Sequence, residues 1–241
     1  MADLNVHLRK FDLFNELSDE DFELCNRLSK GMFRQGKISR GHFLYQDSSR
    51  GGCAHFILTG MMATVCLNSD GSQFPSFFYP PGSILGIPHF ILSDGVKNQG
   101  LTGHLPKAVR NTTYLEITAA DLRKLTTQVP ALYEAMAKYS TSCYMDLIYI
   151  TNILHIPSAR KRICYYLLIR KRPTPYTVLP NYMLNECSIS MLADILGLGR
   201  STVSRELNRM ERLGLIELSP KIRILDEEAL RDYADSEAVS V

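Results

Sequence analysis

Arginine and serine side chains that could contact a nucleic acid recur along one short stretch of the chain, residues 200–213. The stretch contains no Gly or Pro, and its apolar residues recur every three or four positions, which predicts a helix from about Ser201 to Leu213. The residues expected to face inward are Val203, Leu207, Met210 and Leu213, and those expected to face outward are Arg200, Ser201, Ser204, Arg205, Asn208 and Arg209. On such a face an arginine can bond guanine in a bidentate manner, whereas serine suits phosphate or water-mediated contacts.

A shorter helix and a tight turn are expected before this stretch. Ser188 can cap the shorter helix, because its side-chain oxygen can accept a hydrogen bond from an otherwise unpaired amide. The apolar face of this helix consists of Leu192, Ile195 and Leu196. Ala193 is small enough to let a second helix approach closely. Gly197-Leu198-Gly199 predicts the turn, and a helix that begins after such a turn can enter the major groove of DNA.

The residues after the second helix predict a small β-hairpin, or wing. Gly214-Leu215-Ile216 ends the helix and begins a strand, and Ser219-Pro220-Lys221 turns the chain back into a second strand at residues 222–225. The candidate DNA-binding residues are Ser188, Arg200, Ser201, Thr202, Ser204, Arg205, Arg209 and Lys221. The alternative is a helical hairpin whose arginines are merely solvated. The agreement of turn, small-residue contact, basic helix start and wing favours DNA binding.

The distribution of charge supports a polyanion as the partner of this segment. The net charge is only +2, and residues 1–155 carry 14 basic and 14 acidic residues. Residues 156–225 carry 12 Lys and Arg against five acidic residues, and the tail after Leu225 is acidic. A basic segment on a neutral body is the electrostatic pattern of a polyanion-binding protein, although a solvated basic face is the commoner cause of a charge run.

The preceding part of the chain has a different pattern. From about Gly31 to Ile117, short apolar runs alternate with turn formers at residues 68–71 and 80–82, which predicts an all-β sandwich or barrel. Pro130 can begin a long helix, because no Gly or Pro follows until after Ile156. Its apolar residues recur close to a heptad pattern, at Leu132, Ala135, Met136, Tyr139, Cys143, Leu147, Ile150 and Leu154. This seam predicts either pairing with a second copy of the chain or packing on the helix's own domain.

Composition and cysteine spacing argue against several other classes of protein. Hydrophobic residues make up 45% and charged residues 22% of the chain, which is ordinary for a soluble globular protein. No apolar run approaches the roughly 20 residues of a membrane-spanning helix, and the N-terminus does not read as a signal peptide. The six cysteines lie 13 or more residues apart with no Cys-x-x-Cys pair, which favours mostly buried thiols in a reducing cytoplasm.

The two-helix segment is similar to the DNA-binding domain of the cyclic-AMP receptor protein and fumarate–nitrate reductase regulator (CRP/FNR) superfamily. The matching stretches are residues 192–198, 201–207, 214–216 and 222–225, with looser matches at residues 56–60, 70–71 and 81–86. The resemblance implies an α+β protein with a β-roll (jelly-roll) effector-binding domain at 1–125, a dimerisation helix at 126–156 and a winged helix-turn-helix domain at 157–241. It also implies a cytoplasmic homodimer, not an enzyme and not bound to a membrane, that reads a palindromic operator in duplex DNA and acts with RNA polymerase.

Two departures from the family pattern concern the reading of DNA. Gly199 stands where the family often has Ser or Thr, and Ser201 stands where it often has a Glu that reads cytosine. The usual half-site of the family is therefore in doubt. Arg205 matches the base-reading arginine of the family, and we expect it to be the main specificity residue.

The resemblance leaves the effector open. Cyclic-nucleotide members have a Gly-Glu-Leu turn and an Arg-Ser/Thr-Ala segment, but residues 86–88 and 104–108 lack this Glu and the Arg-Ser pair, so cyclic AMP is not expected. The solitary Cys25 does not match the cysteine cluster of iron–sulfur members, and we assign no cofactor. Haem held by one of six scattered histidines, and a redox switch at Cys53 or Cys66, stay open. The remaining candidate is a small, partly apolar organic effector, with expected contacts at Phe77, Tyr79, Gly86, Tyr144, Leu147 and Ile148.

Two rival functions fit the sequence less well. A cupin-like β-roll that binds a ligand or works as a metal enzyme would need clustered His and carboxylate ligands on neighbouring strands. His42 and His55 have no His-x-His or nearby Glu partner along the sequence. A ligand-binding module that has lost DNA binding is disfavoured by the intact Arg200 and Arg205.

Overall fold

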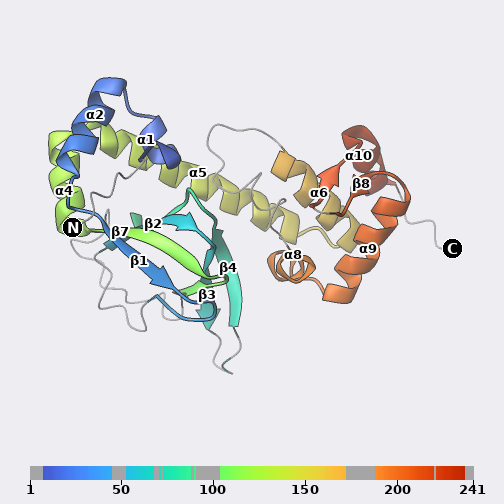
Figure 1. Ribbon diagram of the computed structural model, residues 1–241. Helices are drawn as coiled ribbons and strands as arrows, with labels where there is room; N and C mark the ends of the chain where they lie inside the picture. Colours follow the sequence, from blue (N-terminus) through green and yellow to red (C-terminus); the bar gives the residue numbers. More distant parts are fainter. Residues whose placement is uncertain are drawn as a thin grey trace. The chain divides into compact units, whose positions relative to one another are not determined.

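The computed structural model describes residues 8–44, 53–67, 71, 73–87, 90, 104–171, 188–219 and 221–236 (Figure 1). The chain divides into two compact units, residues 1–143 and 144–241. The first unit contains two antiparallel sheets and several helices, and the second is mainly helical with one small hairpin. The predicted α+β class, with an N-terminal sheet domain and C-terminal helices, is confirmed.

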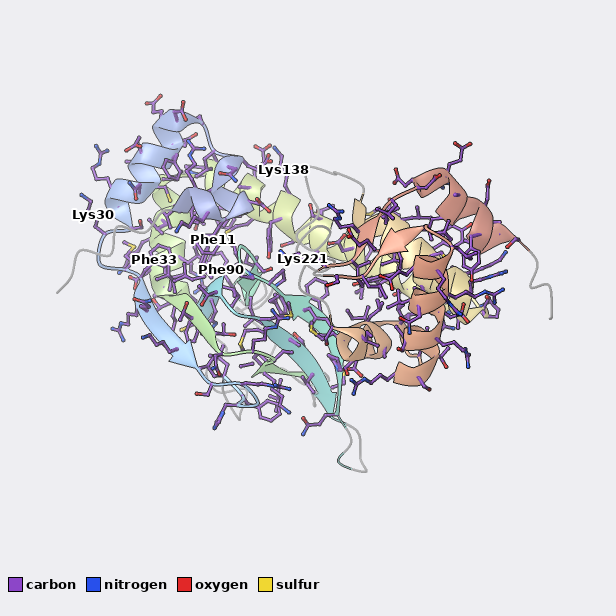
Figure 2. The ribbon with its side chains drawn as sticks, turned by 45° about the vertical axis from the view of Figure 1, so that its right-hand side comes forward. Phe11, Lys30, Phe33, Phe90, Lys138 and Lys221 are labelled. Carbon is purple, nitrogen blue, oxygen red and sulfur yellow. The ribbon has the colours of Figure 1, made fainter. Side chains whose placement is uncertain are left out.

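Three short helices precede the first strand, and none of them was expected from the sequence. They are η1 (Leu8–Lys10), α1 (Asp12–Asn15) and α2 (Asp19–Leu28). The side chain of Ser18 caps α2 by accepting a hydrogen bond from the Asp21 amide at 3.1 Å. Phe11 and Phe33, labelled in Figure 2, contact the ring of Phe56 edge to face, with centroids 5.1 and 5.4 Å apart. These aromatic contacts fix the helices to the sheet.

In the part of the chain that the structure describes, seven strands form the two sheets of the first unit. They are β1 (Arg34–Ile38), β2 (Cys53–Thr59), β3 (Met62–Leu67), β4 (Gln73–Tyr79), β5 (Ile84–Leu85), β6 (His104–Ala108) and β7 (Thr112–Thr118). One sheet has the order β1-β7-β2-β5 and the other β4-β3-β6, with every neighbour antiparallel. The expected strands between Gly31 and Ile117 are therefore present. Of the expected turns, residues 68–70 lie outside the described residues, and Gly82 adopts a left-handed φ of +91°.

The core of this unit lies between the two sheets. Ile57 of the first sheet packs with Met62 and Ala108 of the second. Partly buried side chains close the cluster, namely Ile38, Leu44, Tyr79 and Tyr114. Residues 54–57 of β2 are all buried, because one face of this strand meets the other sheet and the other face meets N-terminal aromatic residues such as Phe11. Burial on both faces explains why residues 54–57 do not alternate between buried and exposed.

Helix α5 (Ala131–Leu154) begins directly after Pro130, as predicted, and continues from the first unit into the second. It follows α4 (Ala119–Gln128). The seam residues in its first part are buried: Leu132, Ala135, Met136 and Tyr139. Leu147 and Leu154 in its second part are 47% and 38% exposed. The first part of the seam therefore packs on its own domain, which was one of the two predicted alternatives. The second part presents apolar side chains at the surface.

Within the described residues, the second unit contains four more helices and a hairpin after α5. They are α6 (Ala159–Lys171), α8 (Ile189–Leu196), α9 (Arg200–Arg212), β8 (Ile216–Glu217), β9 (Arg223–Ile224) and α10 (Glu227–Asp235). Helix α10 packs on α6, and α9 packs on both α6 and α8. The sequence did not predict α10, although Asp226 caps it by accepting from the Ala229 amide at 2.9 Å. Among the helices that the structure describes, none is long and apolar enough to cross a membrane.

Candidate nucleic-acid interface

The first helix of the motif, α8, begins and ends where the sequence predicted. Ser188 accepts a hydrogen bond from the Met191 amide at 3.2 Å, which satisfies one of the unpaired donors of the first turn. Gly197 then adopts a φ of +59°, a left-handed conformation that glycine reaches without strain. The Leu198 amide donates back to the Ala193 carbonyl at 3.0 Å. This closed turn sets the direction in which the next helix leaves.

The second helix, α9, presents one buried face and one exposed basic face. Val203, Leu207 and Met210 are fully buried. The exposed residues are Arg200, Ser201, Arg205, Asn208 and Arg209, and Thr202 and Ser204 are half-buried between the two faces. The side chain of Arg205 is 71% exposed, with its Nε 3.9 Å from an oxygen of Glu206. Most of the Arg205 side chain is therefore accessible to a ligand.

Leu213 corrects one detail of the sequence prediction. It was expected to face inward at the end of α9, but it is 55% exposed. The helix ends at Arg212, and Gly214 with a φ of +71° turns the chain immediately afterwards. Leu215 consequently takes the buried position, with its amide bonded to the Met210 carbonyl at 3.0 Å.

The wing is a two-stranded hairpin that is anchored to α9. Ile216 pairs with Ile224 and Glu217 with Arg223. The Leu218 amide donates to a carboxylate oxygen of Glu211 on α9 at 3.0 Å. Lys221 lies exposed in the hairpin turn (Figure 2), and Pro220 beside it lies outside the described residues. The turn thus offers a lysine next to the helix that carries the exposed arginines.

Several basic side chains that contribute to the charge of residues 156–225 are bound by other protein groups. The Nε of Arg223 donates to Glu217 across the hairpin at 2.7 Å. Lys161 pairs with Asp235 of α10 at 3.4 Å. Arg160 contacts the Ser236 carbonyl and lies over the ring of Tyr233, with its guanidinium carbon 5.0 Å from the ring centroid. The sequence analysis missed these pairings because it did not predict α10, which supplies Tyr233 and Asp235 and is capped by Ser236. Among the basic side chains of residues 156–225 that the structure describes, those that are exposed are therefore concentrated on α9 and the wing.

The residues expected to contact an effector fall into both units. Phe77 and Tyr79 are adjacent on one face of β4, with ring centroids 5.0 Å apart. Gly86 follows β5 with a φ of +100°, and a Cβ there would lie only 2.5 Å from the Cys53 carbonyl. Tyr144, Leu147 and Ile148 lie on α5 in the second unit, where Tyr144 and Leu147 are exposed. A shared pocket for these residues stays a prediction.

Tyr139 is a residue of the first unit whose role the sequence did not reveal. Its hydroxyl accepts a hydrogen bond from the Ile84 amide at 2.7 Å and donates to the Ile84 carbonyl at 3.2 Å. The sequence analysis predicted that Tyr139 lies on the apolar seam of the long helix, and its side chain is buried there. Its hydroxyl fastens α5 to β5, the strand that precedes Gly86.

Histidine and cysteine side chains show little sign of metal or redox chemistry in the part of the chain that the structure describes. His55 does have a carboxylate partner, contrary to the sequence analysis, because the antiparallel register brings Glu116 within 3.1 Å of its Nε2. No group of three His, Cys, Asp or Glu residues gathers there as metal ligands. Burial raises the pKa of Cys25 to about 11 and that of Cys164 to about 12, which keeps both thiols protonated. Cys53 and Cys66 are half-buried.

The serine cap, the glycine turn, the exposed basic helix and the wing together define a winged helix-turn-helix protein. Residues 161–233 match the family model of the Crp-like helix-turn-helix domain. No curated protein matches the chain.

The fold of the whole chain is similar to that of several solved regulators. FixK2 from Bradyrhizobium japonicum matches with a TM-score of 0.64 and 18% identity, over 86% of this chain and 99% of FixK2. A mutant of CooA from Carboxydothermus hydrogenoformans matches with a TM-score of 0.63 and 22% identity, over 84% of this chain and 88% of CooA. A CRP/FNR-family protein from Eubacterium rectale matches with a TM-score of 0.57 and 16% identity, over 95% of this chain and all (100%) of that protein.

These matches confirm the resemblance that the sequence indicated. The chain has the fold of the CRP/FNR regulators, and its C-terminal unit contains a Crp-like helix-turn-helix domain.

Proposed function

We propose that the protein is a homodimer that binds a palindromic operator through α9 and the wing, under the control of a signal sensed in the β-roll. The observation that carries this proposal is the exposed guanidinium of Arg205 on a helix whose opposite face is completely buried. A helix of this kind can enter the major groove with its first two turns against base edges. Binding rather than catalysis is the proposed activity.

The proposed contacts to DNA are of two kinds, those that recognise a base and those that bind a phosphate. Arg205 reads a guanine, because its fork matches the two acceptors that guanine presents in the major groove. Lys221 anchors the wing to a phosphate, and a phosphate contact carries no base information. The hydroxyl groups and the remaining arginines contribute phosphate or water-mediated contacts, namely Ser188, Arg200, Ser201, Thr202, Ser204 and Arg209. The Ser188 oxygen accepts from the Met191 amide, which places this side chain at the start of α8.

The proposed dimer contact lies on the second part of α5. Tyr144, Leu147, Ile148, Thr151 and Leu154 recur at intervals of three and four residues and lie on one face of the helix. Most of this stripe is apolar and exposed, and the charged residue within this part of the helix, Asp146, is 4% exposed and lies away from the stripe. A second copy of the same stripe would cover it in the manner of a coiled coil.

The effector is proposed to be a small, partly apolar organic molecule that contacts the β-roll and the central helix. The surroundings of Gly86 support an apolar ligand over a cyclic nucleotide, because Leu85 and Ile87 on either side are buried apolar residues. Oxidation of Cys53 or Cys66 is the alternative signal. RNA polymerase in the cytoplasm is the further partner that a regulator of this kind would engage.

Selection of duplexes from a random-sequence pool by the wild-type protein tests the proposal. We expect enrichment of two half-sites related by two-fold symmetry, with their centres about 10 base pairs apart or a multiple of this, because two α9 helices of a dimer enter successive major grooves. A gel shift with the enriched duplex measures its affinity. Enrichment of a single, asymmetric site would contradict the dimer, and an unenriched pool would contradict sequence-specific binding.

A further inference from the structure

Arg162 on α6 makes three hydrogen bonds to described residues, and both of their acceptors are main-chain carbonyl oxygens. Its Nε and Nη2 donate to the Ile156 carbonyl at 3.1 and 2.8 Å. Its Nη1 donates to the Leu196 carbonyl at 2.8 Å. Ile156 lies in the link between α5 and α6, and Leu196 is the last residue of α8. A single guanidinium therefore joins three segments of the second unit.

The position of Arg162 at the end of α8 has two physical consequences. The Leu196 carbonyl is one of the last four of the helix, which have no partner within it. A cation at this end is also favoured by the helix dipole. A Cβ added at Gly197 would lie 4.0 Å from the Nη1 of Arg162, so the guanidinium lies against the turn that leads to α9.

The hydrogen bonds of Arg162 distinguish it from the exposed arginines of α9. Its planar fork reaches two carbonyls on different segments, which the single ammonium of a lysine cannot do with the same geometry. Its side chain is half-buried, whereas that of Arg200 is exposed at the start of α9. Arg162 counts toward the basic charge of residues 156–225, yet its nitrogens are directed at the protein's own backbone.

We propose that Arg162 is a positioning residue for DNA binding. It holds the turn at residues 197–199, and thereby the start of α9, in a fixed relation to the link that follows α5. It does not contact phosphate. This role rests on the proposed insertion of α9 into the major groove.

In the proposed dimer, operator binding depends closely on the direction of α9 that Arg162 fixes. The two recognition helices of a dimer must match half-sites about 34–36 Å apart, so a small change in the direction of α9 affects both ends of the operator. A duplex of random sequence imposes no such match, because its binding depends on phosphate neutralisation alone. Loss of Arg162 should therefore affect the selected duplex more than the random one.

The test compares Arg162→Met with two matched variants that remove the same charge. Lys161→Met lies on the same helix and loses only the contact with Asp235. Arg200→Met removes an exposed arginine of α9. The probes are the duplex enriched by the wild-type protein and a random-sequence duplex, titrated at several salt concentrations well below the unfolding transition of every variant.

We expect Arg162→Met to weaken binding of the selected duplex on the order of tenfold, which corresponds to the loss of charge-assisted hydrogen bonds. Its slope of log affinity against log salt should equal that of the wild type, because no phosphate contact is lost. Arg200→Met should flatten that slope by about 0.9, the value for one phosphate. Lys161→Met should bind both duplexes as the wild type does. Amide exchange at Leu198, which lies in the turn, should accelerate in Arg162→Met alone.

Arg162→Lys keeps the positive charge but removes the planar guanidinium. It takes the place of Arg162→Met in the test if Arg162→Met fails to fold. The preference of Arg162→Lys for the selected duplex over the random-sequence duplex should be closer to that of Arg162→Met than to that of the wild type. A salt slope flattened by about 0.9 would make Arg162 a phosphate contact and overturn the proposal. Full rescue by lysine, or a lowered melting temperature with unchanged affinity, would also overturn it. A wild-type protein that selects no duplex would instead contradict the proposed function itself.

Discussion

Arg205→Ala is expected to weaken binding of the cognate duplex by about 1–3 kcal/mol and to flatten discrimination at one base pair of each half-site. The reason is that the guanidinium bonds both acceptors of one guanine, and alanine leaves those acceptors unpaired. The side chain of Arg205 is 71% exposed in the free protein, so thermal stability should hardly change. The measurement is a binding series over duplexes that differ from the selected site by one base pair at a time.

Lys221→Ala is the matched control for Arg205→Ala. Lys221 is exposed in the wing, and its removal should weaken every duplex of the series by a similar factor, since a phosphate contact is independent of base identity. A reversed outcome would contradict the assignment. In that case Arg205→Ala would weaken all duplexes uniformly, and Lys221→Ala would change the preferred base.

Leu147→Glu is expected to convert the dimer into monomers. The side chain lies in the apolar stripe of α5 and is 47% exposed in the single chain. In the proposed dimer the substitution places an unpaired carboxylate from each copy in an apolar contact, which costs several kcal/mol. Analytical ultracentrifugation should show monomers, and affinity for the two-fold symmetric duplex should fall because each half-site is then bound separately.

Tyr149→Glu provides the control for the dimer prediction. Tyr149 is exposed on the same helix but is not three or four residues from any member of the stripe, so the same carboxylate there should leave the dimer intact. A Leu147→Glu protein that remains dimeric with full DNA affinity would refute the placement of the contact on this stripe. Dissociation of both variants would mean that the whole second part of α5 is involved.

The elements that carry the interface were predictable because their signals are local. The three- and four-residue spacing of Val203, Leu207 and Met210 fixes which face of α9 is buried, and Gly197 marks the turn before it. Ser188 was recognisable as a cap from its position alone. The N-terminal helices had a similar signal that was overlooked, since Ser18 with the acidic residues 19–21 is typical of a helix start.

The features that the sequence did not predict depend on contacts between distant residues. Arg162 and Leu196 are 34 positions apart, and nothing near Arg162 distinguishes it from a surface arginine. His55 and Glu116 are 61 positions apart and meet only through the register of β2 and β7. The exposure of Leu213 depends on where the helix ends, which a periodic pattern does not determine.

The most direct test of DNA binding by this protein is the salt dependence of its affinity for the selected duplex. The exposed arginines of α9 and Lys221 on the wing should release counterions from the phosphates that they neutralise. The account predicts that log affinity falls linearly with log salt, with a slope of about −0.9 for each neutralised phosphate and therefore several units in total. An affinity that stays constant between low and physiological salt would contradict DNA binding through this interface.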